Sequence, residues 1–219
     1  QRQMCIRDRL YTLLLCMKRT GFIAFVAGIV VYILVEYRSA PKGSKKRVFV
    51  LLGGLLALTA MYFFIMENTR GTFSVIDRLL STGQTSNEGR EDVWPVVISM
   101  IRHSDIIALI FGHGFDTVIE NSPLALSAHC DFLEVIYDYG VSGLLLYLTF
   151  YKRLWNGFIK MYRQGSELAA PMSFTFVTAF VVSLFSHLII FPTYFLGFCL
   201  FWGLAMGSVD SEDVTLLRY

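Results

Sequence analysis

Residues Leu168 to Val209 read LAAPMSFTFVTAFVVSLFSHLIIFPTYFLGFCLFWGLAMGSV, and this run of 42 residues contains no Asp, Glu, Lys or Arg. A helix of about 20 apolar residues crosses a bilayer core of about 30 Å, so the run is too long for one span and fits two. Phe191-Pro192-Thr193 lies at its midpoint, and proline favours a turn there. We therefore expect membrane helices over about 170–190 and 194–209.

The rest of the chain extends this pattern. Val48 to Met66 is a second charge-free run, of 19 residues, and apolar stretches predict further helices over about 20–36 and 139–155. Hydrophobic residues make up 55% of the 219 residues and charged residues only 16%, against about 25% charged in soluble domains. The predicted fold class is therefore all-α, a polytopic transmembrane helix bundle with about five spans, forming one membrane domain over residues 1–219.

Two compositional features exclude other classes. A net charge of +2 with no long basic stripe argues against a nucleic-acid partner. The four cysteines lie far apart without metal-type spacing, so we expect unpaired thiols. The opening residues 1–9 differ in character from the rest of the chain, and we expect the chain to be a fragment of a longer protein.

The loop charges predict the orientation, because Lys and Arg collect in cytoplasmic loops. The basic residues between the first two predicted spans, and those after the third, place both connections in the cytoplasm. They are Arg38, Lys42, Lys45, Lys46 and Arg47, then Lys152, Arg153, Lys160 and Arg163. The long segment 67–138 then lies outside, and it carries 11 acidic residues against 4 Lys and Arg.

This outer loop has order of its own. Apolar residues at helical spacing predict one helix over Glu91–His103, with Asp92 as its N-cap, and a second over Cys130–Tyr139, with Ser127 as a candidate cap. Phe111–Phe115 reads as a glycine turn between them. Long loops that fold are usually functional, so we expect the chemistry here.

Three motifs stand on the outer side: Lys18-Arg19-Thr20-Gly21, Gly89-Arg90-Glu91-Asp92-Val93-Trp94, and Ala128-His129-Cys130-Asp131, the last followed by a Gly140…Gly143 helix entry. Together with Gly112-His113-Gly114, this order resembles the C-terminal portion of the bacterial O-antigen ligase and O-antigen polymerase superfamily, over roughly residues 19–148. Lys18 stands where the family has serine, and Cys130 where it has a polar residue.

The resemblance implies a membrane glycosyltransferase of the bacterial inner membrane whose active face is periplasmic. It would transfer an oligosaccharide, with inversion, from a polyprenyl-pyrophosphate carrier to lipid A core, another carrier-linked glycan or protein. Arg19 and Arg90 would bind the pyrophosphate, since guanidinium matches phosphate oxygens. His129 would accept the proton of the acceptor hydroxyl or, alternatively, contact phosphate as imidazolium. No metal or other cofactor is implied.

Trp94, His113 and Asp131 complete the candidate substrate-binding set. The ordinary alternatives are packing for Trp94, a surface position for His113, and a solvated or His129-orienting role for Asp131. His187, inside a predicted span, is a functional candidate by its location, with a backbone-bonded neutral imidazole as the alternative. The alternative functions are a transporter or flippase and a non-catalytic subunit of a polysaccharide export system. Ligase and polymerase leave no distinguishing pattern in one sequence.

Overall fold

The computed structural model describes residues 19–39, 52–53 and 90–216. All the regular structure of these residues is helical, which confirms the expected all-α class for this part of the chain. The helices are α2 (Arg19–Ser39), α5 (Arg90–His103), α6 (Ile106–Phe111), α7 (Thr117–Asn121), α8 (Asp131–Asp138), α9 (Gly140–Arg163), α10 (Ala169–Phe185) and α11 (Pro192–Leu216).

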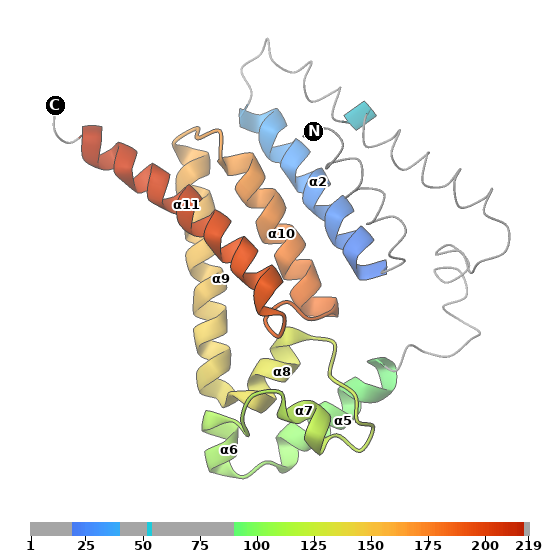
Figure 1. Ribbon diagram of the computed structural model, residues 1–219. Coiled ribbons are helices and arrows are strands. Elements are labelled where there is room, and N and C mark those ends of the chain that lie inside the picture. Colours follow the sequence, from blue (N-terminus) through green and yellow to red (C-terminus); the bar gives the residue numbers. More distant parts are fainter. Residues whose placement is uncertain (1–18, 40–51, 54–89, 217–219) are drawn as a thin grey trace, which may run out of the picture.

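The helices form two groups (Figure 1). The long helices α2, α10, α9 and α11 make a bundle in which α10 lies between α2 and α9, and α11 crosses α9 obliquely. The short helices α5 to α8 gather at one end of this bundle, and α8 runs directly into α9. The helical segment predicted as an outer loop therefore caps one end of the long helices.

Helix α9 is longer than the 139–155 expected from its apolar residues. Its buried residues recur every three or four positions, from Tyr147 through Leu154 to Met161, and so form one continuous face. Lys152 and Arg153 do not end the helix because both are exposed on its other side. The helix continues to Arg163, where basic residues favour the C-terminal end of the helix dipole.

Helix α10 ends at Phe185, earlier than the 190 expected. The backbone N–H groups of Leu188 and Ile189 donate to the Asp131 carboxylate instead of continuing the helical ladder. Helix α11 then begins at Pro192, a residue that is well tolerated in the first helical turn. The connection 186–191 is thus shaped by a buried carboxylate, which the hydropathy pattern does not reveal.

Close packing joins α2 to α10 through small residues, as in many membrane helix pairs. Gly28 faces α10, and a Cβ there would overlap Thr178 and Phe174. Beside it Ala24 is completely buried, and its carbonyl accepts a 3.4 Å hydrogen bond from the Thr178 hydroxyl. On the other side of the bundle Trp202 of α11 is buried among α9 and α10 residues and donates to Thr175.

The predicted span 48–66 lies outside the described residues except at 52–53, as do residues 67–89 of the predicted outer loop. Among the helices of the described residues, none reaches the combined length and apolar character of a membrane crossing. The five-span arrangement therefore stays a prediction.

Both helices expected in the outer loop are observed, as α5 and α8, but the predicted caps are wrong. Helix α5 begins at Arg90, so Asp92 is inside it. The N-cap of α8 is Cys130, which makes no side-chain capping bond. Ser127 lies three residues earlier, and its hydroxyl is instead 2.8 Å from Nε2 of His187.

We expect Gly28→Ala to destabilise the protein, because the added methyl group has no room between α2 and α10. Overpacking of this kind costs about 1–3 kcal/mol. Gly203→Ala on α11 is the matched control, since a Cβ there meets nothing within 4 Å, and alanine favours a helix by up to about 1 kcal/mol. Thermal unfolding of both variants in detergent measures the effect, and equal midpoints would contradict this packing.

Candidate functional site

The glycine motifs build the framework of the capping helices. Gly112 and Gly140 have φ values of +85° and +68°, which favour glycine. A Cβ at Gly112 would overlap the Asp138 carbonyl, and one at Gly140 would overlap the Ile110 carbonyl. Gly114 N–H donates to the same Asp138 carbonyl at 2.9 Å. The glycines therefore let the turn after α6 lie directly against the junction of α8 and α9.

Trp94 fastens α5 to the segment that carries His129. Its indole N–H donates to the Ala128 carbonyl at 2.8 Å. Val93 and Val97 on the same helix, with Val118 of α7, form a buried cluster around Ala128. The structure thus gives Trp94 a packing and hydrogen-bonding position, the ordinary alternative to a substrate contact.

His129 lies in a turn that is held from both sides. Its φ of +49° is the left-handed conformation, which is uncommon for a residue other than glycine. The Ala128 N–H donates to Glu134 Oε1 at 2.7 Å, and the Ala128 carbonyl accepts from Trp94. Cys130 then caps α8 in an extended conformation. Such strain persists where surrounding contacts fix the backbone, and it concentrates at functional sites.

The ring of His129 lies against the ring of His187, with 4.8 Å between the ring centroids. His187 Nδ1 is 3.7 Å from Glu134 Oε1, and its Nε2 is 2.8 Å from the Ser127 hydroxyl. We call His129, His187, Glu134 and Ser127 the histidine cluster. Its members come from the α7–α8 connection, from α8 and from the α10–α11 connection, so the capping helices and the bundle meet at this point.

Asp131 ties these three parts together. Its side chain is fully buried, with 0% of the residue exposed. The carboxylate accepts the Tyr147 hydroxyl at 3.1 Å, the Leu188 N–H at 3.0 Å and the Ile189 N–H at 3.3 Å. Because it is enclosed, Asp131 is placed to position the 186–191 connection, and its role as a substrate contact stays a prediction.

Glu134 has an unusual titration. Its side chain is 1% exposed, and burial raises its pKa from 4.5 to about 7, helped by the nearby carboxylates of Asp138, Asp116 and Asp131. The Ala128 N–H opposes the shift. Among the described residues none hydrogen-bonds Glu134 Oε2. A carboxyl group poised near neutrality beside two imidazoles is an arrangement suited to proton transfer.

The candidate arginines begin the two helices that flank the histidine cluster. Arg19 is the first residue of α2, and the next residue, Thr20, donates to the Phe185 carbonyl at 3.4 Å, two residues before His187. Arg90 is the first residue of α5, one turn before Trp94. The Arg19 and Arg90 side chains lie outside the described part of the chain, so only their helix starts are placed.

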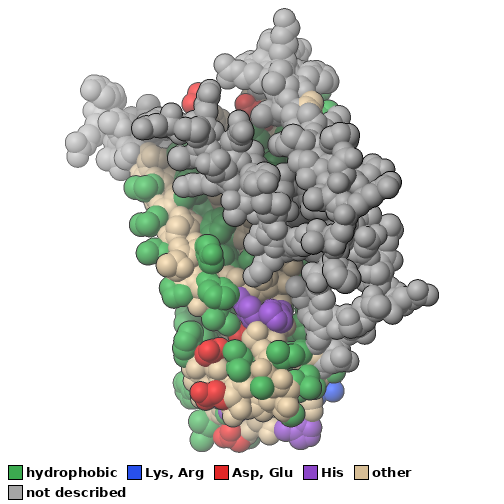
Figure 2. Space-filling view, turned by 45° about the vertical axis from the view of Figure 1, so that its right-hand side comes forward, with side chains coloured by type: hydrophobic (Ala, Val, Ile, Leu, Met, Phe, Trp, Pro, Cys, Tyr) green, Lys and Arg blue, Asp and Glu red, His purple; other side chains and the backbone are tan. Residues whose placement is uncertain are grey.

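His113 lies apart from this cluster. It is exposed, stacks on Tyr137 with ring centroids 4.2 Å apart, and its Nδ1 is 3.2 Å from the Tyr137 carbonyl. Figure 2 shows histidine side chains at two separate places on one face of the molecule. Within residues 19–39, 52–53 and 90–216, no three His, Cys, Asp or Glu side chains group as a metal site would.

The segment before the His129 turn is open to solvent. Residues 123–126 are all exposed, including the apolar side chains of Leu124 and Leu126. This segment leads directly along the chain into Ser127 of the histidine cluster.

The comparison with known families bears on this geometry. The sequence profile described as O-antigen ligase matches residues 10–148. The chain belongs to the O-antigen ligase family. A search of the curated proteins found no match, and neither did a search of the solved structures.

Family membership confirms the resemblance drawn from the motifs and implies a ligase-type enzyme of polysaccharide biosynthesis that acts on glycan and lipid-linked substrates. The matched residues include Arg19, Arg90 and His129 but end before His187. The O-antigen ligase profile alone would therefore not identify His187 as the residue whose ring contacts His129. In the sequence His187 stands out only for its place in an apolar run, and no spacing rule links it to a histidine 58 positions earlier.

We expect Glu134 to make the stability depend on pH. A folded-state pKa of about 7 against 4.5 unfolded means that the folded state binds the proton more tightly. The contribution of Glu134 to stability is therefore fully present below about pH 4.5 and is lost as the pH rises through about 7. Glu134→Gln keeps an acceptor for the Ala128 N–H and should remove this part of the pH dependence.

The measurement is the thermal midpoint of both proteins between pH 5 and pH 8. The variant should gain stability relative to the wild type as the pH rises. Parallel curves would show that Glu134 titrates at its ordinary value.

Proposed function

We propose that the chain is a membrane glycosyltransferase that moves an oligosaccharide from a polyprenyl-pyrophosphate carrier to a hydroxyl acceptor. The observation that carries this proposal is the His129–His187 pair beside a carboxyl group of raised pKa, close to the first turns of α2 and α5, which contact Phe185 and Ala128. Membership of the O-antigen ligase family supports the same reaction class.

The membrane setting follows from the charge pattern of the sequence. The five expected spans and their basic connections place the capping helices α5 to α8 on the periplasmic face of the inner membrane. In Figure 1 these helices lie at one end of the bundle, and the C-terminal end of α9, which carries Lys160 and Arg163, lies at the other, as this orientation requires. A carrier lipid in the outer leaflet then presents its pyrophosphate at the level of the histidine cluster.

The arginines would act on the donor. When the bond between the anomeric carbon and the pyrophosphate oxygen breaks, negative charge grows on the departing pyrophosphate. Preplaced guanidinium groups at Arg19 and Arg90 stabilise this charge more in the transition state than in the ground state. This stabilisation works without a metal ion.

His129 would act on the acceptor. The acceptor oxygen forms the new bond to the anomeric carbon from the side opposite the pyrophosphate, which inverts that carbon, and its proton passes to the imidazole of His129. The imidazolium that forms lies beside His187, whose Nδ1 is 3.7 Å from Glu134. An ionised Glu134 would stabilise positive charge on this pair of rings.

The first test uses the full-length parent in a cell that lacks its own copy. Arg90→Ala and His129→Ala should each abolish surface glycan and leave carrier-linked donor accumulating, since general base catalysis alone contributes about 10²- to 10⁴-fold. Arg102→Ala, on the same helix as Arg90, and His103→Ala are matched controls, because both residues are exposed at the far end of α5. Carrier-linked and surface glycan are measured together at equal expression.

The nature of the accumulated donor separates the possible roles. Full-length glycan on the carrier would indicate a ligase, and single repeat units would indicate a polymerase. Wild-type glycan from both active-site variants would refute the catalytic assignment and favour the transporter or non-catalytic subunit.

A second test concerns His187, which we expect to position and electrostatically support His129. His187→Gln can still hydrogen-bond Ser127 but cannot carry charge. We expect turnover to fall about tenfold with little change in KM, and the acidic limb of the kcat profile to move by about half a pH unit or more. A pH profile superimposable on the wild type would leave His187 with a packing role only.

A further inference from the structure

A second polar site lies away from the histidine cluster, between α9 and α11. A pocket of about 490 Å³ opens there, lined by Thr149, Lys152, Arg153, Asn156, Gly157, Lys160 and Met206. None of these residues belongs to α8 or to the 186–191 connection, so the pocket is separate from the proposed transferase site. Neither the transferase proposal nor the family match accounts for it.

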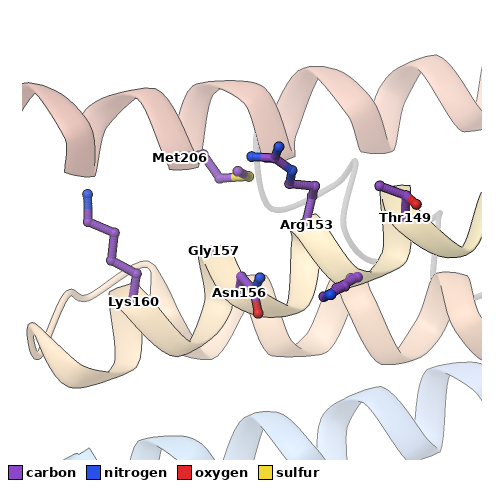
Figure 3. A pocket seen from close by; sticks show the side chains of 7 residues that line it. Thr149, Arg153, Asn156, Gly157, Lys160 and Met206 are labelled. Atoms are coloured by element: carbon purple, nitrogen blue, oxygen red, sulfur yellow. The ribbon is translucent and has the colours of Figure 1, made fainter. Parts of the chain in front are cut away.

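The lining is cationic. Lys152, Arg153 and Lys160 contribute three basic side chains, and among the described residues the lining contains no Asp or Glu. Arg153 and Lys160 are seven positions apart, about two helical turns, and therefore lie on the same face of α9. Figure 3 shows the Arg153 and Lys160 side chains reaching from α9 towards α11, on either side of Met206.

A glycine contact sets the floor of the pocket. A Cβ at Gly157 would meet the Met206 sulfur at 3.1 Å, so α9 and α11 approach closely here. Arg153 lies one turn before Gly157 and Lys160 nearly one turn after it. Arg153 and Lys160 therefore lie on either side of this close contact, and the space between them is at the crossing of α9 and α11.

Exposed apolar side chains continue the pocket-lining face of α9. Leu145 and Leu146 continue the Thr149 face of α9 towards its N-terminus and are 59% and 73% exposed. A phospholipid has acyl chains next to its phosphate, whereas a soluble phosphate has none. Basic side chains beside exposed leucines therefore match a phospholipid better than a soluble phosphate.

We infer that this pocket binds the phosphate headgroup of an anionic phospholipid. Arg153 and Lys160 hold the phosphodiester from two sides, and Lys152 adds a third charge. Asn156 offers hydrogen bonds to the glycerol oxygens, and the acyl chains lie along Leu145 and Leu146. In the expected orientation this lipid belongs to the cytoplasmic leaflet, opposite the face of the histidine cluster.

The test titrates the purified full chain with dioctanoyl phosphatidylglycerol or dioctanoyl phosphatidylcholine and counts bound lipid by native mass spectrometry. The wild type should bind phosphatidylglycerol preferentially. Each cation near a phosphate surface is worth about fivefold in affinity, so Arg153→Gln with Lys160→Gln should weaken binding about thirtyfold. Arg102→Gln with Arg163→Gln removes the same charge from exposed positions outside the pocket and should leave binding unchanged.

Three results would overturn the inference. The first is equal binding of both lipids by the wild type, and the second is an equal loss of affinity in the pocket and control variants. The third is displacement of phosphatidylglycerol by millimolar inorganic phosphate with no lipid preference remaining, which would assign the pocket to a soluble phosphate. Surface-glycan synthesis by the pocket variant is recorded separately, so failure here is distinguishable from failure of the transferase proposal.

Discussion

The buried carboxylate of Asp131 is the contact on which the arrangement of the site depends. It accepts the backbone N–H groups of Leu188 and Ile189 and the hydroxyl of Tyr147, and so joins the start of α8, the middle of α9 and the connection after α10. A buried carboxylate is stabilised only when such donors surround it. The same contacts end α10 at Phe185 and direct the chain so that His187 meets His129.

A second acidic residue, Glu134, is buried where desolvation disfavours its ionised form. Oε1 of Glu134 accepts a hydrogen bond from the Ala128 N–H, and the same oxygen lies near Nδ1 of His187. Structural and electrostatic roles are therefore combined in a single side chain. The Asp131 carboxylate, by contrast, is held by backbone N–H groups and a tyrosine hydroxyl of the protein framework. Two carboxylates three residues apart on α8 thus serve different purposes because their neighbours differ.

The sequence predicted the helical class, the helices α5 and α8, and the family, because periodic apolar residues and ordered motifs are local patterns. It placed His129 at the start of α8 for the same reason. It did not predict where α10 ends, since that boundary depends on Asp131, 57 positions away from Leu188. It also could not pair His129 with His187, because their contact is created by the meeting of two connections. The predicted caps failed since Ser127 bonds across the fold and not along its own helix.

The turn at Ala128–Cys130 and the exposed segment 123–126 differ in what they can accommodate. The turn has its N–H and carbonyl groups committed on both sides and a strained residue at its centre. Residues 123–126 are exposed, although Ala125 shares the left-handed φ of +49° and donates its N–H to the Ser122 carbonyl, so their side chains are freer to change than their backbone. Side chains at Leu124 and Leu126 can therefore change without disturbing the backbone of the Ala128–Cys130 turn, which is fixed by contacts to Glu134 and Trp94.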